Sequence, residues 1–323
     1  MTKVVIAHAS YVISELERDA FSAIDASVVQ TGNLETPEAL EEARKADALM
    51  VTIQQVDAEL IRSLERCQII ARVGTGLDAI DIPAATERGI WVTSVPDYAV
   101  DEVSTHAIAL LLNQARRLQK MFASVKAGRW YDAATIEPAS RLQGQVLGLI
   151  GYGRIGRMVA AKARGLGLLV LVYDPFIELD AGANGGLKQV DLDALLKSAD
   201  FISLHSPLSE SSRHIINADA LEKMKPSAYL INTARGELID EEALLAAVQC
   251  GRIAGAALDV LTVEPPPPDF PLLHDERITI TPHAGWYSEA SKLDVRVKAI
   301  DDVVRVLTGE APRSAVNNPI SNQ

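Results

Sequence analysis

The chain has few cysteines and few aromatic residues. Its 323 residues include two cysteines, Cys67 and Cys250, and aromatic side chains make up 5% of the sequence. Two isolated cysteines exclude a disulfide framework of the kind that holds small secreted proteins together, and neither has the spacing of a metal site. We therefore predict no bound metal. The core must be aliphatic, which a hydrophobic fraction of 48% can supply.

The sequence also lacks a long apolar run and an excess of basic residues. No stretch approaches the roughly 18 residues of a membrane span, and residues 3–8 have the pattern of a first strand rather than of a signal peptide. With 31 Lys and Arg against 43 Asp and Glu, the formal net charge is -12. This balance disfavours binding to nucleic acid or to an anionic membrane. We expect a cytoplasmic protein, in which any site for an anionic substrate is a local positive exception.

A glycine-rich segment near the middle of the chain is typical of dinucleotide binding. Residues 151–156 (GYGRIG) follow the apolar run 146–150 and open a segment compatible with a helix. In this pattern the first glycine permits a tight turn, the second lets a pyrophosphate approach the backbone, and the third lets the helix pack close to the strand. The helix N-terminus offers N–H groups to the phosphates. Without its flanking strands, the same motif would be only a glycine turn.

The acid that follows the next apolar run indicates which dinucleotide binds. Residues 168–173 are apolar and are followed by Asp174. A carboxylate at this position can accept hydrogen bonds from the adenosine ribose hydroxyls and would repel a 2′-phosphate. We therefore predict NAD as the cofactor rather than NADP.

Short apolar runs alternate with amphipathic segments along the chain, which predicts parallel βαβ units. The fold class is therefore α/β, with two doubly wound parallel-sheet domains. A Rossmann cofactor domain (98–287) is inserted into a flavodoxin-like substrate domain (1–97 and 288–323). The expected strands are residues 4–8, 26–30, 48–52, 69–73 and 90–93 in the first domain, and 146–150, 168–173, 201–204, 228–232, 253–259 and 278–281 in the second.

Two segments at the start of the cofactor domain allow alternative interpretations. Residues 100–126 contain neither Gly nor Pro and are strongly apolar, which predicts one long helix, either an interdomain connector or one more core helix. Residues 128–141 have no clear period and carry aromatic residues of an exposed type. They form either a surface loop or an arm that packs on a second copy of the chain. We favour the arm, and hence a homodimer.

Three segments that could carry chemistry each follow a predicted strand, at the edge where open α/β sheets bind ligands. Arg235 has a planar guanidinium suited to bidentate capture of a carboxylate, although a surface arginine in a loop would look the same. Glu264 precedes four prolines, and taken alone it is better explained as a solvated acid in a proline-rich loop. His283 lies in a turn after the last strand and is a natural acid–base group, although lone histidines are more often structural.

Taken together, the glycine motif, the acid after the second strand and the three strand-end residues resemble the NAD-dependent D-isomer-specific 2-hydroxyacid dehydrogenases. The resemblance covers essentially the whole chain. Residues 95–98 and 283–289 are further similar to the branch of that family that contains the C-terminal-binding proteins. The segments that carry the family resemblance are residues 72–78 (RVGTGLD), 151–156, 232–236 (NTARG) and 281–284 (TPHA).

The motif and the resemblance together imply a set of site residues. Asp259 would bond the nicotinamide carboxamide, the loop at residues 74–76 would present N–H groups to the substrate carboxylate, and Trp286 would form a wall of the substrate pocket. The implied catalytic residues are Arg235, Glu264 and His283. The implied cofactor contacts are Gly151, Gly153, Arg154, Ile155, Gly156, Asp174, His205, Pro207, Thr233, Ala234, Asp259 and Val103, and the implied substrate contacts are Arg72, Gly74, Thr75, Gly76 and Trp286.

These residues predict the reduction of a 2-oxo acid. Arg235 would hold the carboxylate and the ketone. His283, when protonated, would deliver a proton to the ketone oxygen as NADH gives hydride to the carbonyl carbon. Glu264 would hydrogen-bond the other imidazole nitrogen and favour the charged ring. Reduction is then favoured at lower pH and oxidation at higher pH, because oxidation needs the neutral ring.

Other functions are compatible with the same sequence. The C-terminal-binding branch includes corepressors that use NAD to control assembly and dock short peptides, although the complete catalytic set favours an enzyme. A reductase for another anion, such as a phosphorus oxyacid, is a third hypothesis. Among 2-oxo acids, glyoxylate, hydroxypyruvate, pyruvate-like acids and bulkier acids are all open. The sequence has no additional basic cluster for a phosphorylated substrate.

Overall fold

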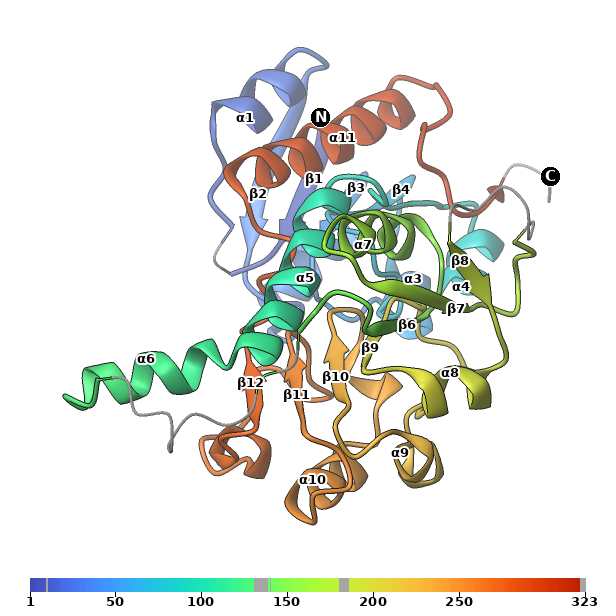
Figure 1. Ribbon diagram of the computed structural model, residues 1–323. Helices are drawn as coiled ribbons and strands as arrows, with labels where there is room; N and C mark the ends of the chain where they lie inside the picture. The colour runs from blue at the N-terminus through green and yellow to red at the C-terminus, as the bar shows by residue number, and fades with distance from the viewer. Residues whose placement is uncertain (10, 131–138, 140, 180–185, 320–323) are drawn as a thin grey trace. The chain divides into compact units, whose positions relative to one another are not determined.

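The computed structural model divides the chain into two compact units (Figure 1). Unit 1 comprises Met1–Tyr98 and Ser288–Gln323, and unit 2 comprises Ala99–Tyr287. The structure describes all residues except 10, 131–138, 140, 180–185 and 320–323. In this described part, no helix is long and apolar enough to cross a bilayer. The same residues contain no group of three or more His, Cys, Asp or Glu side chains that could hold a metal ion.

Unit 1 contains a five-stranded parallel sheet in the order β2-β1-β3-β4-β5. This 2-1-3-4-5 order is that of flavodoxin-like folds. The strands are β1 (Thr2–Ala7), β2 (Ala26–Thr31), β3 (Ala48–Val51), β4 (Ile69–Arg72) and β5 (Trp91–Thr93), and the helices are α1 (Glu15–Ser22), α2 (Pro37–Arg44), α3 (Ala58–Ser63), α4 (Ile82–Glu87) and α11 (Glu289–Leu307).

Helices bury both faces of this sheet. Because successive side chains of a strand point to opposite faces, Val4 and Val5 of β1 belong to two different clusters. One cluster lies under α2, α3 and α4. The other lies under α1 and α11, where Phe21 and Ile300 pack against the sheet. The last helix of the chain thus completes a core that the first strand begins.

A buried ion pair joins the two chain segments of unit 1. Glu17 of α1 is 0% exposed, and its two carboxylate oxygens accept hydrogen bonds of 2.7 and 2.6 Å from Nε and Nη2 of Arg296 in α11. Burial alone would raise the pKa of Glu17, but hydrogen bonds from Ser14, Arg296 and Tyr11 hold it below its ordinary value. A bidentate pair of this kind fixes orientation as well as distance, so α11 has a defined position on α1.

Unit 2 contains a seven-stranded parallel sheet in the order β12-β11-β10-β9-β6-β7-β8. The direction of strand addition reverses between β6 and β9, which is the topological switch point where doubly wound sheets bind ligands. The strands are β6 (Val146–Ile150), β7 (Leu169–Tyr173), β8 (Leu187–Gln189), β9 (Phe201–Leu204), β10 (Tyr229–Asn232), β11 (Gly255–Leu258) and β12 (Ile278–Ile280). The helices are α5 (Val100–Arg116), α6 (Leu118–Lys126), α7 (Arg154–Gly165), α8 (Leu192–Ser198), α9 (Ala218–Lys223) and α10 (Glu241–Gln249), with 3-10 turns at Gly236–Leu238 and Pro271–His274.

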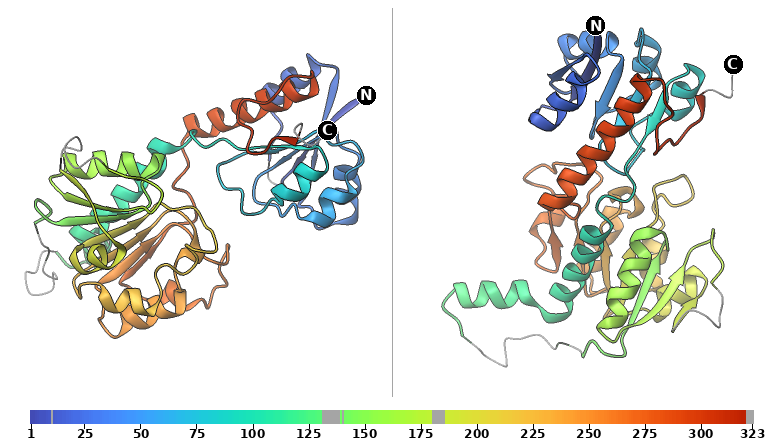
Figure 2. Two further views of the ribbon diagram at one scale, coloured as in Figure 1. Left: turned by 90° about the vertical axis from the view of Figure 1, so that its right-hand side faces the viewer. Right: turned by 90° about the horizontal axis from the view of Figure 1, so that it is seen from above.

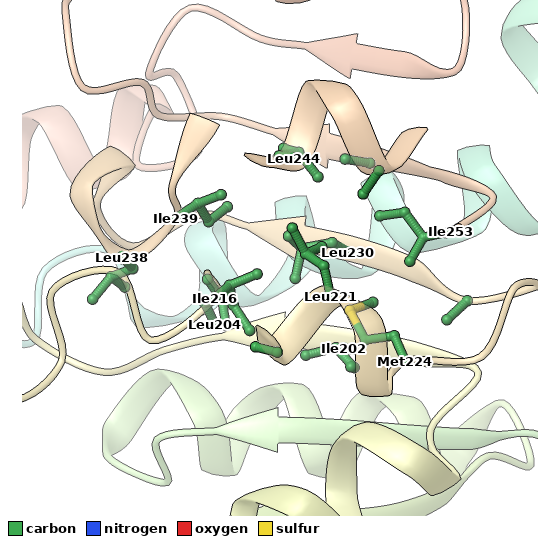
Figure 3. Close-up of a cluster of buried hydrophobic side chains, with 14 of the residues drawn as sticks. Ile202, Leu204, Ile216, Leu221, Met224, Leu230, Leu238, Ile239, Leu244 and Ile253 are labelled. Carbon is green, nitrogen blue, oxygen red and sulfur yellow. The ribbon is translucent and has the colours of Figure 1, made fainter. Parts of the chain in front are cut away.

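Helices also cover both faces of the second sheet (Figure 2). Leu230 and Ile231, consecutive in β10, belong to opposite clusters. Leu230 packs with Leu221 and Leu244 from α9 and α10 (Figure 3). Ile231 belongs to the cluster under α5 and α7. Both faces of the central strands are therefore apolar, which leaves the strand ends as the place for polar chemistry.

The fold class predicted from the sequence is confirmed, but two details of the prediction are wrong. The second sheet has seven strands rather than six. The missed strand, β8, is a three-residue edge strand whose Lys188 and Gln189 give no apolar run. The helix predicted over residues 100–126 is broken at Arg117, which has a left-handed φ of 57°. The Arg117 guanidinium carbon lies 4.9 Å from the centroid of the Tyr229 ring, a tertiary contact that a search for Gly and Pro cannot detect.

The first of these two helices is a core element of unit 2. Seven of its residues are buried, including Ala107, Leu110 and Leu111. At one end, Ser104 accepts a hydrogen bond of 2.8 Å from Lys162 of α7. At the other end, Gln114 donates to the carbonyl of Ala256 in β11 at 2.7 Å. Helix α5 is therefore fixed to both α7 and the sheet.

Candidate active site

The three glycines of the turn after β6 have three different environments. Gly151 has a φ of 93°, and a Cβ there would lie 2.6 Å from the backbone of His205 and Ser206. A Cβ on Gly156 would lie 2.4 Å from the carbonyl oxygen of Gly151. Gly153, by contrast, has no atom within 4 Å of its Cβ position. Two glycines are thus required by the fold, and the middle one leaves open space over the start of α7.

The start of α7 has the donors that a phosphate needs. Its first backbone hydrogen bond runs from Arg157 N–H to the carbonyl of Gly153, so the N–H groups of residues 154–156 precede the intrahelical ladder. A helix of 12 residues also places the positive end of its dipole here. The open space at Gly153 and these N–H groups fit a dinucleotide pyrophosphate.

Asp174, at the end of β7, links the glycine turn to the loop that follows. One of its carboxylate oxygens accepts the N–H of Tyr152 at 2.8 Å, and the other accepts the N–H of Phe176 at 2.9 Å. Each oxygen of a carboxylate can accept two hydrogen bonds. The side chain therefore positions the turn and retains acceptor capacity for the hydroxyls of a ribose.

His205 lies at the switch point, directly after β9. Its N–H donates to the carbonyl of Ile150, and its Nε2 lies 2.9 Å from Oγ of Ser203. Burial lowers the pKa of His205 to about 4, so the ring is neutral at physiological pH. A neutral ring beside the glycine turn makes a structural contact rather than a charged one.

Two buried hydroxyls at strand ends support the presence of a ligand. Oγ of Ser206, after β9, and Oγ1 of Thr233, after β10, are both buried and have no hydrogen-bond partner among the described residues. An unpaired buried hydroxyl is costly, and both follow strands at the edge where this fold binds dinucleotides. These orphaned groups and the open cradle at Gly153 fit a nicotinamide dinucleotide.

The loop after β10 is held by Asn232, a residue absent from the predicted set. Its side chain is fully buried, donates to the carbonyl of Arg235 at 2.7 Å and accepts the N–H of Ala234 at 3.0 Å. The Arg235 side chain donates to the carbonyl of Ala234 at 2.6 Å. An asparagine directly before Thr-Ala-Arg-Gly is the sequence signal for this turn, because Asn side chains readily bond nearby backbone groups.

Gly236 brings the arginine loop against the loop that carries Glu264. A Cβ on Gly236 would lie 2.1 Å from the carbonyl carbon of Leu261 and 2.2 Å from the nitrogen of Thr262. Leu261 in turn donates its N–H to Oε1 of Glu264 at 2.8 Å. The absence of a side chain at Gly236 is what allows the two loops to touch.

Glu264 and His283 form a direct pair. Oε2 of Glu264 lies 2.6 Å from Nδ1 of His283, and both side chains are partly exposed. Burial alone would raise the pKa of Glu264, but the hydrogen bonds from His283 and from the N–H of Leu261 lower it below its ordinary value of 4.5. Glu264 is therefore a carboxylate at neutral pH, and it can only accept a hydrogen bond from Nδ1–H of His283.

The turn that carries His283 is built on Asp259. His283 has a left-handed φ of 52°, and its N–H donates to the carbonyl of Asp259 at 2.8 Å. The Asp259 side chain is 3% exposed. It accepts the N–H groups of Ala284 at 3.0 Å and Gly285 at 2.8 Å, and the hydroxyl of Thr281 at 2.6 Å.

The predicted substrate loop of unit 1 is braced by its own arginine. Nε of Arg72 donates to the carbonyl of Gly76 and Nη1 to that of Val73, both at 2.9 Å. A Cβ on Gly74 would lie 2.7 Å from Nη1 of Arg72. Thr75 donates to the carbonyl of Val95 at 3.1 Å. Arg72 thus shapes the loop from within.

The other predicted residues lie on the same elements of unit 2. Val103 is in the first turn of α5, and partly buried Ala234 follows Thr233. Exposed Pro207 accepts a hydrogen bond from Ser212 through its carbonyl at 2.8 Å. Trp286 packs edge-to-face against Tyr287, with ring centroids 5.6 Å apart. Besides Asn232, the sequence analysis missed His106 of α5 and Thr281, which both contact Asp259.

The fold and these strand-end groups define a two-unit α/β protein with a nicotinamide-dinucleotide domain. Residues 108–285 match the family model described as D-isomer specific 2-hydroxyacid dehydrogenase, NAD binding domain. The chain belongs to this family.

Relatives cover most of the chain. A glyoxylate reductase of Korarchaeum cryptofilum is 36% identical over 284 residues, which are 87% of this chain and 86% of that protein. A D-3-phosphoglycerate dehydrogenase of Archaeoglobus fulgidus is 39% identical over 90% of this chain, but the match spans only 55% of that longer protein. The structure of a D-lactate dehydrogenase from Aquifex aeolicus complexed with NAD and lactic acid superposes with a TM-score of 0.86 at 29% identity, covering 95% of this chain and 96% of that one. The narrower likeness to C-terminal-binding proteins stays a hypothesis.

The open space at Gly153 yields a prediction about cofactor binding. In Gly153→Ala the new methyl group meets no protein atom, so the fold should be unchanged while the methyl occupies the space of the pyrophosphate. We expect NADH affinity to fall about 10-fold or more and the melting temperature to stay within about 2 °C. Fluorescence titration and thermal unfolding measure the two effects.

A matched control lies on the same helix. Gly165 also has no atom within 4 Å of its Cβ position, but it is at the far end of α7. Gly165→Ala should bind NADH like the wild type. Equal affinity in Gly153→Ala and wild type would place the pyrophosphate elsewhere.

Proposed function

We propose that the protein is an NAD-dependent D-2-hydroxyacid dehydrogenase that reduces a small or medium 2-oxo acid. The observation that carries the proposal is the 2.6 Å contact between Glu264 and His283, on a loop that Gly236 holds against the loop of Arg235. Arg235, Glu264 and His283 thus follow β10, β11 and β12, three successive strands of a dinucleotide-binding sheet. Family membership supports the same activity.

The proton chemistry depends on which imidazole nitrogen of His283 is hydrogen-bonded to Glu264. Nδ1 of His283 is committed to Glu264, so Nε2 is the atom that can exchange a proton with a substrate oxygen. In reduction the protonated ring gives the Nε2 proton to the developing alkoxide. In oxidation the neutral Nε2 accepts the hydroxyl proton. Glu264 stays ionised in both directions and stabilises the positive ring.

Arg235 is proposed to bind the substrate carboxylate. The proposal rests on its place at the end of β10 and on the planar fork of five N–H donors that an arginine carries. In unit 1, the N–H groups of residues 74–76 are proposed to bind a substrate carboxylate, with Arg72 holding their loop in shape. Trp286 is proposed as an apolar wall that limits the size of the substrate side chain.

The proposed cofactor contacts use the strand ends of unit 2. The cofactor, when bound, would supply hydride to the carbonyl carbon of the substrate. Asp174 would accept the ribose hydroxyls, and its charge disfavours a 2′-phosphate. Thr233 and Ser206 would gain partners for their buried hydroxyls. Of the two Asp259 oxygens, Oδ2 accepts the N–H of Gly285 and is the one proposed to meet the carboxamide.

A substrate screen tests the proposal as a whole. Consumption of NADH is followed with glyoxylate, hydroxypyruvate, pyruvate and 2-oxo acids of increasing side-chain size, and the series is repeated with NADPH. We expect turnover with at least one acid, and a kcat/KM at least about 10-fold higher with NADH, because Asp174 repels the 2′-phosphate. Activity chiefly with NADPH would contradict the role of Asp174.

The role of His283 predicts a specific pH dependence. In the wild type, reduction should slow as the pH rises and the ring loses its proton, whereas oxidation should slow as the pH falls. His283→Asn removes the exchangeable proton, so kcat should fall about 100- to 10,000-fold, and the residual rate should lose this dependence. A variant that keeps the wild-type pH profile would rule out His283 as the acid–base group.

The alternative function is an NAD-responsive binding module of the C-terminal-binding type. Residues 95–98 and 283–289 favour it through their resemblance to that branch. The two functions differ in one measurable respect, since a binding module would bind NADH tightly and turn over none of the acids in the screen.

We further propose a homodimer formed through α6. None of the nine residues of α6 is buried within the described chain, and Leu118, Phe122 and Val125 are exposed. The lining of a groove beside the helix includes the apolar residues Ala109, Leu110, Phe122 and Ala123. An apolar face of this kind is typical of a symmetric interface between two copies. The arm predicted at residues 128–141 lies mostly outside the described residues.

A single charge on α6 tests the dimer. Phe122→Asp buries a carboxylate in the proposed interface and should shift the protein from dimer to monomer in sedimentation velocity. Phe176, which is 87% exposed in unit 2, offers the matched control, since Phe176→Asp should stay dimeric. A monomeric wild type, or a dimeric Phe122→Asp variant, contradicts the proposal.

A further inference from the structure

We propose that His106 is a positioning residue that holds the catalytic turn through Thr281 and Asp259. This inference rests on the proposed role of His283 but concerns a side chain that neither the glycine motif nor the strand-end motifs include. His106 lies on α5, outside the three strand-end loops, and reaches the turn from the side of the helix. Its Nε2 is 2.9 Å from Oγ1 of Thr281 and 3.3 Å from Oδ1 of Asp259.

The turn needs such a support because its backbone is strained. His283 has a φ of 52°, a left-handed conformation that is unfavourable for a residue with a side chain. Strain of this kind persists only where the surroundings over-determine the backbone. Here the surroundings are the Asp259 carboxylate and its donors, the N–H groups of Ala284 and Gly285 and the hydroxyl of Thr281.

The direction of each hydrogen bond assigns the protonated nitrogen of His106. Burial alone would raise the pKa of Asp259, but hydrogen bonds from His106, Thr281 and the N–H groups of Gly285 and Ala284 lower it. Asp259 is thus ionised and has no proton to give, so Thr281 donates its single hydroxyl proton to Asp259. Thr281 can then only accept from His106, which requires a proton on Nε2.

The helix that carries His106 is itself held in a fixed position. Helix α5 is tied to α7 through Ser104 and to β11 through Gln114. A Cβ on Gly285 would lie 3.3 Å from Cδ2 of His106, so the imidazole ring lies against the turn as well as bonding to it. A series of hydrogen bonds therefore connects α5 to the backbone of His283. It passes through His106, Thr281 and Asp259.

Replacing His106 by Gln or by Asn distinguishes a role in hydrogen bonding from a role in packing. The amide nitrogen of Gln reaches the position of imidazole Nε2, whereas that of Asn stops near the position of Nδ1. Leu resembles His in volume but has no donor. If His106 acts through its Nε2–H, then His106→Gln should retain function, and His106→Asn and His106→Leu should both lose it. If the ring only fills space, His106→Leu should be the best of the three.

The expected result is a loss of about 10- to 100-fold in kcat for His106→Leu and His106→Asn. Losses of this size are found when a residue that orients an active-site side chain is removed. His106→Gln should stay within about 3-fold of the wild type. Thr281→Val, which removes the hydroxyl at constant shape, should match His106→Leu and carries the test if that variant does not fold. Wild-type kcat in both His106→Leu and Thr281→Val would overturn the proposal, as would equal losses in His106→Gln and His106→Leu.

A matched control lies on the same helix. Asn113 of α5 donates to Oγ1 of Thr279 in β12 at 3.2 Å, so Asn113→Leu removes an equivalent bond between α5 and β12 away from the turn. This variant should keep the kcat of the wild type. An equal loss in Asn113→Leu would show that the effect belongs to the seating of α5 and would overturn the specific role of His106.

A second readout is independent of catalysis. In a Trp91→Phe, Trp130→Phe background, Trp286 is the only tryptophan, and it follows the turn directly. In the cofactor-free protein, acrylamide quenching of Trp286 should increase in His106→Leu and stay unchanged in His106→Gln. If the wild type reduces no 2-oxo acid, the proposed function fails, whereas this readout still decides whether His106 holds the turn. Unchanged quenching in His106→Leu would overturn the proposal.

Discussion

The geometry of the candidate site depends on one buried carboxylate. Asp259 is 3% exposed, and its side chain accepts two N–H groups and one hydroxyl from the turn at residues 281–285. Charge-assisted hydrogen bonds of this kind are among the stronger ones in proteins. They hold His283 in a left-handed conformation, and this conformation places its Nδ1 against Glu264. Without the Asp259 carboxylate, these three donors of the turn would lose their acceptor.

Parallel strands bring the remaining groups to the same edge. β10, β11 and β12 are neighbours in the sheet, so the loops that follow them emerge side by side although their residues are far apart in sequence. Gly236 then decides how closely the first two loops approach, because any side chain there would meet the backbone of Leu261 and Thr262. Gly236 is thus required because a side chain would collide with the neighbouring loop, and not because its backbone has a left-handed φ.

The glycine turn after β6 contains glycines in two different environments. Gly151 and Gly156 are required because the protein itself fills the space beside them. Gly153 has no protein atom within 4 Å of its Cβ position, and it leaves this space open at the start of α7, where the N–H groups of residues 154–156 lie. This contrast, together with the unpartnered hydroxyls of Ser206 and Thr233, is the structural argument for a dinucleotide at the switch point.

The sequence alone determined the α/β class, the parallel strands and the segments that make up the candidate site, because apolar periodicity and glycine spacing are local properties of the chain. The tertiary structure decided what these properties cannot encode. The edge strand β8 forms by pairing with β7 without an apolar run, and α5 and α6 separate at Arg117 because its side chain stacks on Tyr229, a residue 112 positions away in the sequence. Likewise, His106 is one of several polar residues in α5, and only the packing of α5 on the sheet brings it to Thr281 and Asp259. Contacts between residues distant in sequence arise from the packing of whole elements, which no local pattern specifies.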